Sequence, residues 1–203
     1  MLNFEDQYYS DKINIIVGCD EAGRGPLAGP VVAAAVILPK GYKNDLINDS
    51  KKLTEKQREK VFLDIIKNSI SFALTYIDSE TIDKINILEA SRKAMSDSIK
   101  KLKTKPDLIV TDAMYLYGFS QEIVPIIKGD AKCECIAAAS IIAKVCRDRY
   151  MKAISSKYPQ YNFQKNKGYG TKDHLEALNL YGPIKGFHRF SFAPVRFSKI
   201  KLF

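Results

Sequence analysis

The sequence contains only two histidines, and no Ser-His-Asp or Cys-His arrangement in it suits nucleophilic catalysis. Neither His174 nor His188 has the surroundings of a metal ligand. His174 stands near an expected helix start, where Thr171 could be the cap, so we interpret this histidine as structural. Chemistry based on a histidine base or a histidine-bound metal is therefore not expected.

Long apolar runs are also missing. No stretch of eighteen apolar residues occurs, which argues against a membrane-spanning helix. Residues 1–13 mix acids, amides and tyrosines and lack the apolar core of a signal peptide. We therefore expect a cytoplasmic protein with no membrane partner. Its 203 residues, 46% hydrophobic and 27% charged, suit one globular domain or one domain with an appendage.

Cysteine is scarce as well, and the four residues of this type sit among apolar neighbours: Cys19, Cys133, Cys135 and Cys146. We interpret them as reduced and mostly buried thiols. A zinc site is the alternative. The Cys-x-Cys spacing at Cys133 is unusual for zinc fingers, and no nearby histidine completes a ligand set.

The net charge of +9 is concentrated near the C-terminus. Residues 151–203 carry ten Lys or Arg against two Asp or Glu, whereas residues 1–150 carry 22 against 21. Ten of the 21 Tyr and Phe residues also fall in this last segment. Basic charge mixed with aromatic rings favours a nucleic-acid surface over a merely solvated tail. We thus expect a core over residues 1–150 and a basic, aromatic substrate-binding segment over residues 151–203.

The spacing of apolar residues, and the Gly and Pro residues that interrupt the apolar runs, predict an α/β fold. Its strands come first, followed by helices mixed with further strands. The expected strands are Ile13–Cys19, Gly29–Leu38, Ser71–Ile77, Leu108–Thr111 and Glu122–Ile127. The expected helices are Thr54–Asn68, Thr81–Lys103, a buried one at Ile136–Tyr150, and a short one at Asp173–Leu180. Thr54 and Gln57 have capping-box spacing, which marks the start of the first helix.

Three of these strands run into acidic residues: Asp20 and Glu21, Asp112, and Asp130. If the strands are parallel neighbours, their carboxyl ends meet at one edge of the sheet and the carboxylates converge. Gathered carboxylates repel one another, and Mg²⁺ or Mn²⁺ relieves that repulsion with oxygen ligation. Each acid could instead merely cap a turn. The coincidence at three strand ends favours a metal site able to cleave phosphodiesters.

Five ordered motifs, spanning about residues 17–194, resemble bacterial ribonuclease HII. They are VGCDEAGRG with GPVVAA from Val17, NDSKKL from Asn48, KGD from Lys128, AASIIAK with RDR from Ala138, and KGYGT with His174 from Lys167. The resemblance implies an RNase H-like mixed sheet flanked by helices, with a smaller C-terminal segment of loops and helices. It also implies a catalytic, metal-binding tetrad of Asp20, Glu21, Asp112 and Asp130, where Asp112 rests on the short match TDAM from Thr111 and on its place after a strand.

The activity implied by this resemblance is metal-dependent endonucleolytic hydrolysis on the 5′ side of ribonucleotides. The substrates would be RNA–DNA hybrids and duplex DNA carrying single ribonucleotides. Two ions, Mn²⁺ or Mg²⁺, would assist attack by water and departure of the 3′-oxygen, leaving 3′-hydroxyl and 5′-phosphate ends. We further expect a monomer.

Substrate recognition is expected from residues around the acids. The resemblance implies that Gly23, Arg24 and Gly25 read the 2′-hydroxyl through backbone groups, which glycine allows to approach closely. It also implies that the Tyr169 ring packs on the sugar of the following deoxynucleotide, although alone Tyr169 could simply pack a loop.

Two further groups are candidates for holding phosphates. Asp49, Ser50 and Lys51 are expected to start a helix or turn beside the site, where surface capping is the alternative role. Ser140 and Lys144 lie one turn apart on the buried helix, and a lysine there needs an exit to solvent or phosphate.

Three other functions were weighed. Ribonuclease HIII typically lacks an arginine at the position of Arg24 and has an extra N-terminal domain, for which residues 1–16 leave no room. A non-catalytic nucleic-acid-binding protein would not need all four acids. A nucleotide-binding loop at Gly23–Gly29 would be followed by GK[ST], which is absent.

Overall fold

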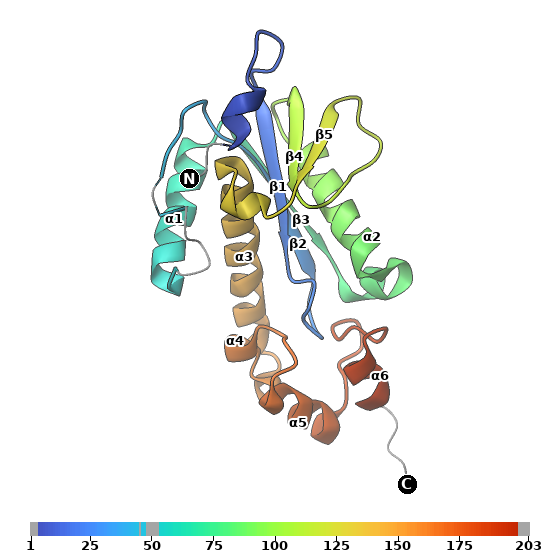
Figure 1. Ribbon diagram of the computed structural model, residues 1–203. Coiled ribbons are helices and arrows are strands. Elements are labelled where there is room, and N and C mark those ends of the chain that lie inside the picture. The colour runs from blue at the N-terminus through green and yellow to red at the C-terminus, as the bar shows by residue number, and fades with distance from the viewer. Residues whose placement is uncertain (1–3, 45, 48–52, 199–203) are drawn as a thin grey trace.

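The computed structural model describes residues 4–44, 46–47 and 53–198, and its centre is a mixed five-stranded sheet (Figure 1). The strand order is β3-β2-β1-β4-β5. The strands are β1 (Ile16–Ala22), β2 (Val31–Ile37), β3 (Ser71–Ile77), β4 (Leu108–Asp112) and β5 (Glu122–Ile126). Strand β2 is antiparallel to both β1 and β3, whereas β1, β4 and β5 run parallel. The expected α/β fold is confirmed.

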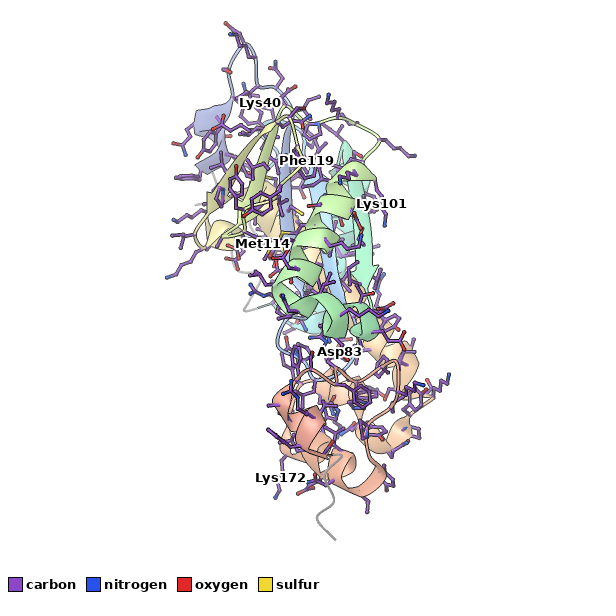
Figure 2. All side chains as sticks on the ribbon, turned by 90° about the vertical axis from the view of Figure 1, so that its right-hand side faces the viewer. Lys40, Asp83, Lys101, Met114, Phe119 and Lys172 are labelled. Carbon is purple, nitrogen blue, oxygen red and sulfur yellow. The ribbon has the colours of Figure 1, made fainter. Side chains whose placement is uncertain are left out.

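Helices cover both faces of this sheet. On one face lie α1 (Glu55–Asn68) and α3 (Glu134–Ser155), and on the other lies α2 (Ser79–Lys100), which fills the foreground of Figure 2. Side chains alternate along β1, so Ile16 packs toward α3 and Val17 toward α2. At Gly18 a Cβ atom would lie 2.2 Å from the Cys135 carbonyl carbon, so this glycine lets α3 lie close to the sheet.

The chain after α3 forms a separate small layer at the lower end of Figure 1. It comprises α4 (Phe163–Asn166), α5 (Lys172–Tyr181) and α6 (Ala193–Ser198), together with a 3-10 turn at Pro159–Tyr161. Asp83 of α2, labelled in Figure 2, accepts hydrogen bonds from the backbone of Phe190 and Ser191, both at 2.8 Å. Residues 187–189 also pair with residues 27–29, which fixes this layer against the loop after β1.

Strand β1 and helix α3 both extend beyond the ends predicted from the sequence. Strand β1 continues to Ala22 because its pairing with β2 continues to Val32. Helix α3 runs two residues earlier and five later than expected, across residue 150. The capping box of Thr54 and Gln57 is confirmed, as is the Thr171 cap of α5. The division of the chain at residue 150 stays a prediction.

The cysteines are free thiols; Cys19, Cys133 and Cys135 are buried and Cys146 is partly buried. None of the helices in the described ranges is both long and apolar enough to cross a membrane.

Candidate active site

Asp20 and Asp112 occupy equivalent positions on neighbouring parallel strands. Cys19 of β1 pairs with Thr111 of β4, and each acid follows one residue later. Gly18 faces α3, so Asp20, two residues on, points toward the same helix. Asp112 likewise follows Val110, which packs in the core on the α3 side. The pairing of β1 with β4 therefore brings the two strand ends, and with them Asp20 and Asp112, to the same edge of the sheet, as expected.

The Asp20 carboxylate is buried between β1 and α3, with 6% of the residue exposed. Its Oδ1 accepts a hydrogen bond from the Glu21 amide at 2.7 Å, and the Ser140 side chain of α3 also bonds to it. Burial raises the pKa of Asp20 well above its usual range, and the nearby Glu21 and Asp112 charges add to that rise. An anion held in this way favours a nearby cation.

Glu21 lies on the same edge although it is the next residue along the strand. One carboxylate oxygen, Oε1, is 3.5 Å from Arg24 Nη1. The other, Oε2, is buried and has no hydrogen-bond partner among the described residues. Burial raises the pKa of Glu21, Arg24 opposes that rise, and Asp112 adds to it. Glu21 thus supplies a buried oxygen that a ligand could satisfy.

Asp130 reaches this edge through a 3-10 turn, Gly129–Ala131, rather than at a strand end as expected. The Gly129 amide donates to Asp112 Oδ1 at 2.7 Å. A Cβ atom on Gly129 would lie 3.4 Å from the Thr111 carbonyl oxygen, so this turn packs closely on the end of β4. Asp130 itself is only 8% exposed. The backbone therefore carries Asp130 beside Asp112.

These acids have the donor chemistry that a hard divalent ion requires, namely clustered carboxylate oxygens and one buried oxygen without a partner. Their side chains are not arranged as a finished cage: within the described ranges, no three His, Cys, Asp or Glu groups converge as a metal-binding set. The residues fit such an ion by chemistry and by position on the backbone, with side-chain rotation needed to close around it.

A cavity of about 350 Å³ opens beside Glu21, which is the one of these four acids in its lining. Its lining comes from β1 and the loop after it, from α1, α3 and from the loop before α5: Glu21, Ala22, Gly23, Arg58, Ser140, Ile141, Lys144 and Tyr169. Four of the expected substrate-binding residues, Gly23, Ser140, Lys144 and Tyr169, therefore share this cavity with the acid Glu21.

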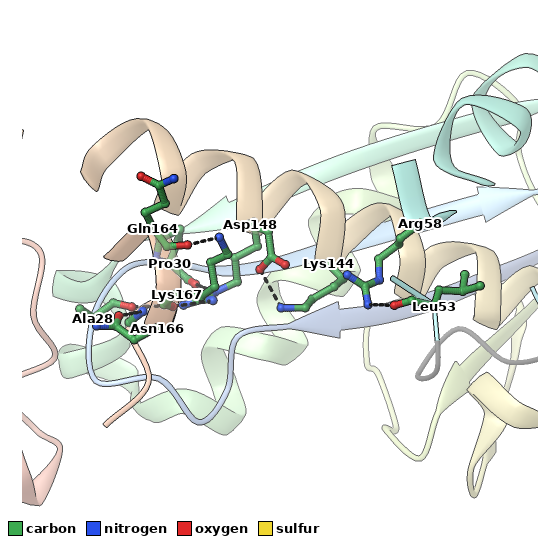
Figure 3. A network of polar contacts seen from close by, with 11 residues as sticks. Ala28, Pro30, Leu53, Arg58, Lys144, Asp148, Gln164, Asn166 and Lys167 are labelled. Carbon is green, nitrogen blue, oxygen red and sulfur yellow. Dashed lines mark hydrogen bonds and ion pairs between the residues drawn. The ribbon is translucent and has the colours of Figure 1, made fainter. Parts of the chain in front are cut away.

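Gly25 and Arg24 border the same region. A Cβ atom on Gly25 would be 3.6 Å from Cε1 of Tyr169, so the tyrosine ring lies beside this glycine. The Arg24 side chain is about half exposed and reaches back to Glu21. Lys144 is held by Asp148 at 2.7 Å and remains partly exposed (Figure 3). Asp49, Ser50 and Lys51 lie outside the described residues.

Arg58 is a cavity residue that sequence reasoning missed. It lies in the first turn of α1, and its Nη2 donates to the Leu53 carbonyl at 2.9 Å (Figure 3). In the sequence it is one of several charged residues of α1, with nothing to set it apart from Lys56, Glu59 or Lys60. Only the packing of α1 against α3 shows that it faces the cavity.

Residues 17–195 match the family model described as Ribonuclease HII. The chain is 51% identical over 192 residues to ribonuclease HII of Ruminiclostridium cellulolyticum, covering 95% of this chain and 75% of that one. It is 53% identical over 194 residues to that of Acholeplasma laidlawii, covering 96% and 95%. The ribonuclease H2 structure from Pyrococcus horikoshii has a TM-score of 0.79 at 27% identity, covering 91% and 97%.

Proposed function

The chain belongs to the ribonuclease HII family, and from this premise we propose that it nicks duplex DNA on the 5′ side of a single embedded ribonucleotide. As a member of that family it is a metal-dependent endoribonuclease that cleaves RNA in RNA–DNA hybrids. We also propose that it acts as a monomer in the cytoplasm.

One observation supports the finer activity best. The acid Glu21 at the end of β1 and Gly23 just after it line a single cavity that also contains Tyr169, and Gly25 lies beside the Tyr169 ring. A scissile phosphate at the acids would place the neighbouring sugar against the Gly23–Gly25 backbone. Backbone amides and carbonyls can both donate to and accept from a 2′-hydroxyl, which DNA lacks.

We assign Asp20, Glu21, Asp112 and Asp130 as the carboxylates that hold two divalent ions, Mn²⁺ or Mg²⁺. When bound, such ions increase the acidity of water and stabilise negative charge on phosphate oxygens. The Glu21 amide and the Ser140 side chain already hold the Asp20 carboxylate in place beside α3, so the other acids would turn toward it. The same residues explain why the site needs cations, since the carboxylates are buried and repel one another.

The reaction that fits this site is hydrolysis. The oxygen of a water molecule bonds to phosphorus while the bond from phosphorus to the 3′-oxygen breaks, which leaves 3′-hydroxyl and 5′-phosphate ends. The 2′-hydroxyl serves recognition and does not attack. Ser140, Lys144 and Arg58 would contact phosphates along the cavity, and the Tyr169 ring would pack on the next deoxyribose.

The test uses a DNA duplex with one ribonucleotide, an all-DNA duplex of the same sequence, and one with a 2′-O-methyl group in place of the 2′-hydroxyl. Each is incubated with Mn²⁺, with Mg²⁺ and with EDTA, and the nick is mapped at nucleotide resolution. We expect a metal-dependent nick immediately 5′ of the ribose in the first duplex alone. Cleavage restricted to long RNA tracts would contradict the proposal.

A further inference from the structure

Arg147 of α3 is a buried cation held by three backbone carbonyls from two separate loops. Its Nε donates to Pro30 at 2.9 Å, its Nη2 to Ala28 at 3.2 Å, and its Nη1 to Lys167 at 3.0 Å. Figure 3 shows these three carbonyl-bearing residues gathered at one end of α3. Only 1% of Arg147 is exposed. The ion pairs formed in the described part of the chain do not include its guanidinium.

The two loops are the ones that border the candidate site. We name residues 23–30 the glycine loop and residues 167–171 the tyrosine loop. A Cβ atom on Gly23 would lie 2.1 Å from Arg147 Nε, so the guanidinium packs directly against this glycine. Cζ of Arg147 is also 5.9 Å from the centre of the Tyr169 ring. One side chain therefore contacts both loops and the ring between them.

Arg189 provides a comparison, because it is equally buried yet holds only the glycine loop. Its guanidinium donates to the carbonyls of Gly23 at 2.7 Å, Arg24 at 2.9 Å and Gly29 at 3.0 Å. No bond from it to the tyrosine loop occurs among the described residues. Arg189 bonds to one loop, whereas Arg147 bonds to both; the loops also meet directly, where the Leu27 amide donates to the Gly168 carbonyl at 2.8 Å.

We propose that Arg147 is a specificity-determining positioning residue, which sets the distance between the glycine loop and Tyr169. The inference rests on the proposed function, in which the glycine loop reads the ribose and Tyr169 contacts the following deoxyribose. A fixed spacing lets both contacts form only where a ribonucleotide is followed by a deoxynucleotide. A guanidinium suits this task because its planar donors point in fixed directions, which a lysine ammonium cannot reproduce.

The test is Arg147→Lys in the full chain, with kcat/KM measured on two substrates. One is a duplex with a single ribonucleotide, and the other is a uniform RNA strand paired with DNA. We expect the ratio of the two values to fall by about tenfold, because a small displacement of a positioned contact has large kinetic effects. Arg149→Lys is the matched control on the same helix, since Arg149 is an exposed partner of Glu59, and its ratio should not change.

Equal losses on both substrates, or an unchanged ratio with normal activity, would overturn the proposal. Thermal unfolding accompanies each assay, and Arg147→Gln, which keeps one amide donor, replaces the lysine variant if that variant does not fold. Failure of both to fold would make Arg147 a folding residue only and would also overturn the proposal. Cleavage by the wild-type protein separates failure of the proposed function from failure of the Arg147 proposal. If the wild type makes no nick at the single ribonucleotide, the proposed function is refuted, and the Arg147 proposal with it.

Discussion

The Nε2 atoms of His174 and His188 are 3.0 Å apart, and their other contacts determine which one carries the proton. His188 Nδ1 accepts a hydrogen bond from the Ile184 amide, so its proton is on Nε2. That Nε2–H donates to His174 Nε2, and His174 Nδ1–H then donates to the Tyr169 carbonyl at 2.8 Å. Both rings are neutral in this series of hydrogen bonds, and the last bond of the series is made to the backbone of the tyrosine loop.

Acid should loosen this histidine pair. Burial lowers the pKa of His188 to about 3, and the adjacent His174 adds to that effect. Because the folded pKa lies below the unfolded value of about 6.5, the stability that this group contributes is complete above pH 6.5 and is lost as pH falls toward 3. The slope for one such group approaches about 1.4 kcal/mol per pH unit.

Urea unfolding at pH 7.5 and pH 5.0 measures this dependence. The buried carboxylates have raised pKa values and act in the opposite direction. The comparison is therefore with His188→Gln, whose amide can still donate to His174 but does not titrate. We expect a smaller loss of stability in acid for the variant than for the wild type. Identical losses would contradict the neutral pair.

Asp20→Asn should stabilise the protein in EDTA while abolishing cleavage. Burial and the neighbouring Glu21 charge disfavour ionisation of this carboxylate and raise its pKa. Asparagine keeps an oxygen for the Glu21 amide and removes the repulsion. Each kcal/mol gained would raise Tm by about 2–4 °C in a chain of this size, whereas activity should fall at least about a thousandfold. Scanning calorimetry in EDTA measures the first effect, and a lower Tm would contradict the account of the site.

Gly23→Ala and Gly25→Ala should differ although they stand two residues apart. Gly23 has a φ of 101°, and an added Cβ would collide with Arg147, so its substitution should cost about 1–3 kcal/mol of stability. At Gly25 the added Cβ makes ordinary contact with Tyr169, so stability should change by less than about 0.5 kcal/mol.

Cleavage at a single ribonucleotide should nonetheless fall in the Gly25 variant, because the methyl group occupies the place where the backbone would approach the sugar. Urea unfolding and kcat/KM of both variants check the pair. Full activity of Gly25→Ala would remove that glycine from substrate recognition.

Arg58→Met should raise KM about five- to tenfold and leave kcat nearly unchanged, because Arg58 lines the cavity and its guanidinium bonds to the Leu53 carbonyl. Loss of one phosphate contact should also reduce the salt dependence of binding by about one unit of slope. Steady-state kinetics at several salt concentrations measure both effects. A fall in kcat with constant KM would place Arg58 in the chemistry instead.

The sequence predicted the parts of this site that depend on local patterns. Apolar runs that end in Asp20 and Asp112 indicated two strands and an edge where the acids meet, and the sheet register agrees. The extent of β1 was not predictable, because its last residues are fixed by pairing with β2. Asp130 departs from the strand-end pattern because a 3-10 turn, not a strand, carries it to the edge.

The residues that organise the two loops were not identified from sequence. Arg147 belongs to a charged RDR run that follows the apolar part of the helix predicted at Ile136–Tyr150. Two of the three carbonyls that hold it, and all those that hold Arg189, come from residues more than a hundred positions away. Such roles depend on tertiary contact and leave no local periodicity.

The central claim is that the carboxylates at the ends of β1 and β4 hold the catalytic ions. Anomalous diffraction from crystals of the protein soaked in Mn²⁺ tests it directly. The account predicts a manganese peak within about 2–2.4 Å of carboxylate oxygens of Asp20 and Asp112, with Glu21 or Asp130 completing the ligands. Manganese bound only elsewhere on the chain, with this edge empty, would contradict it.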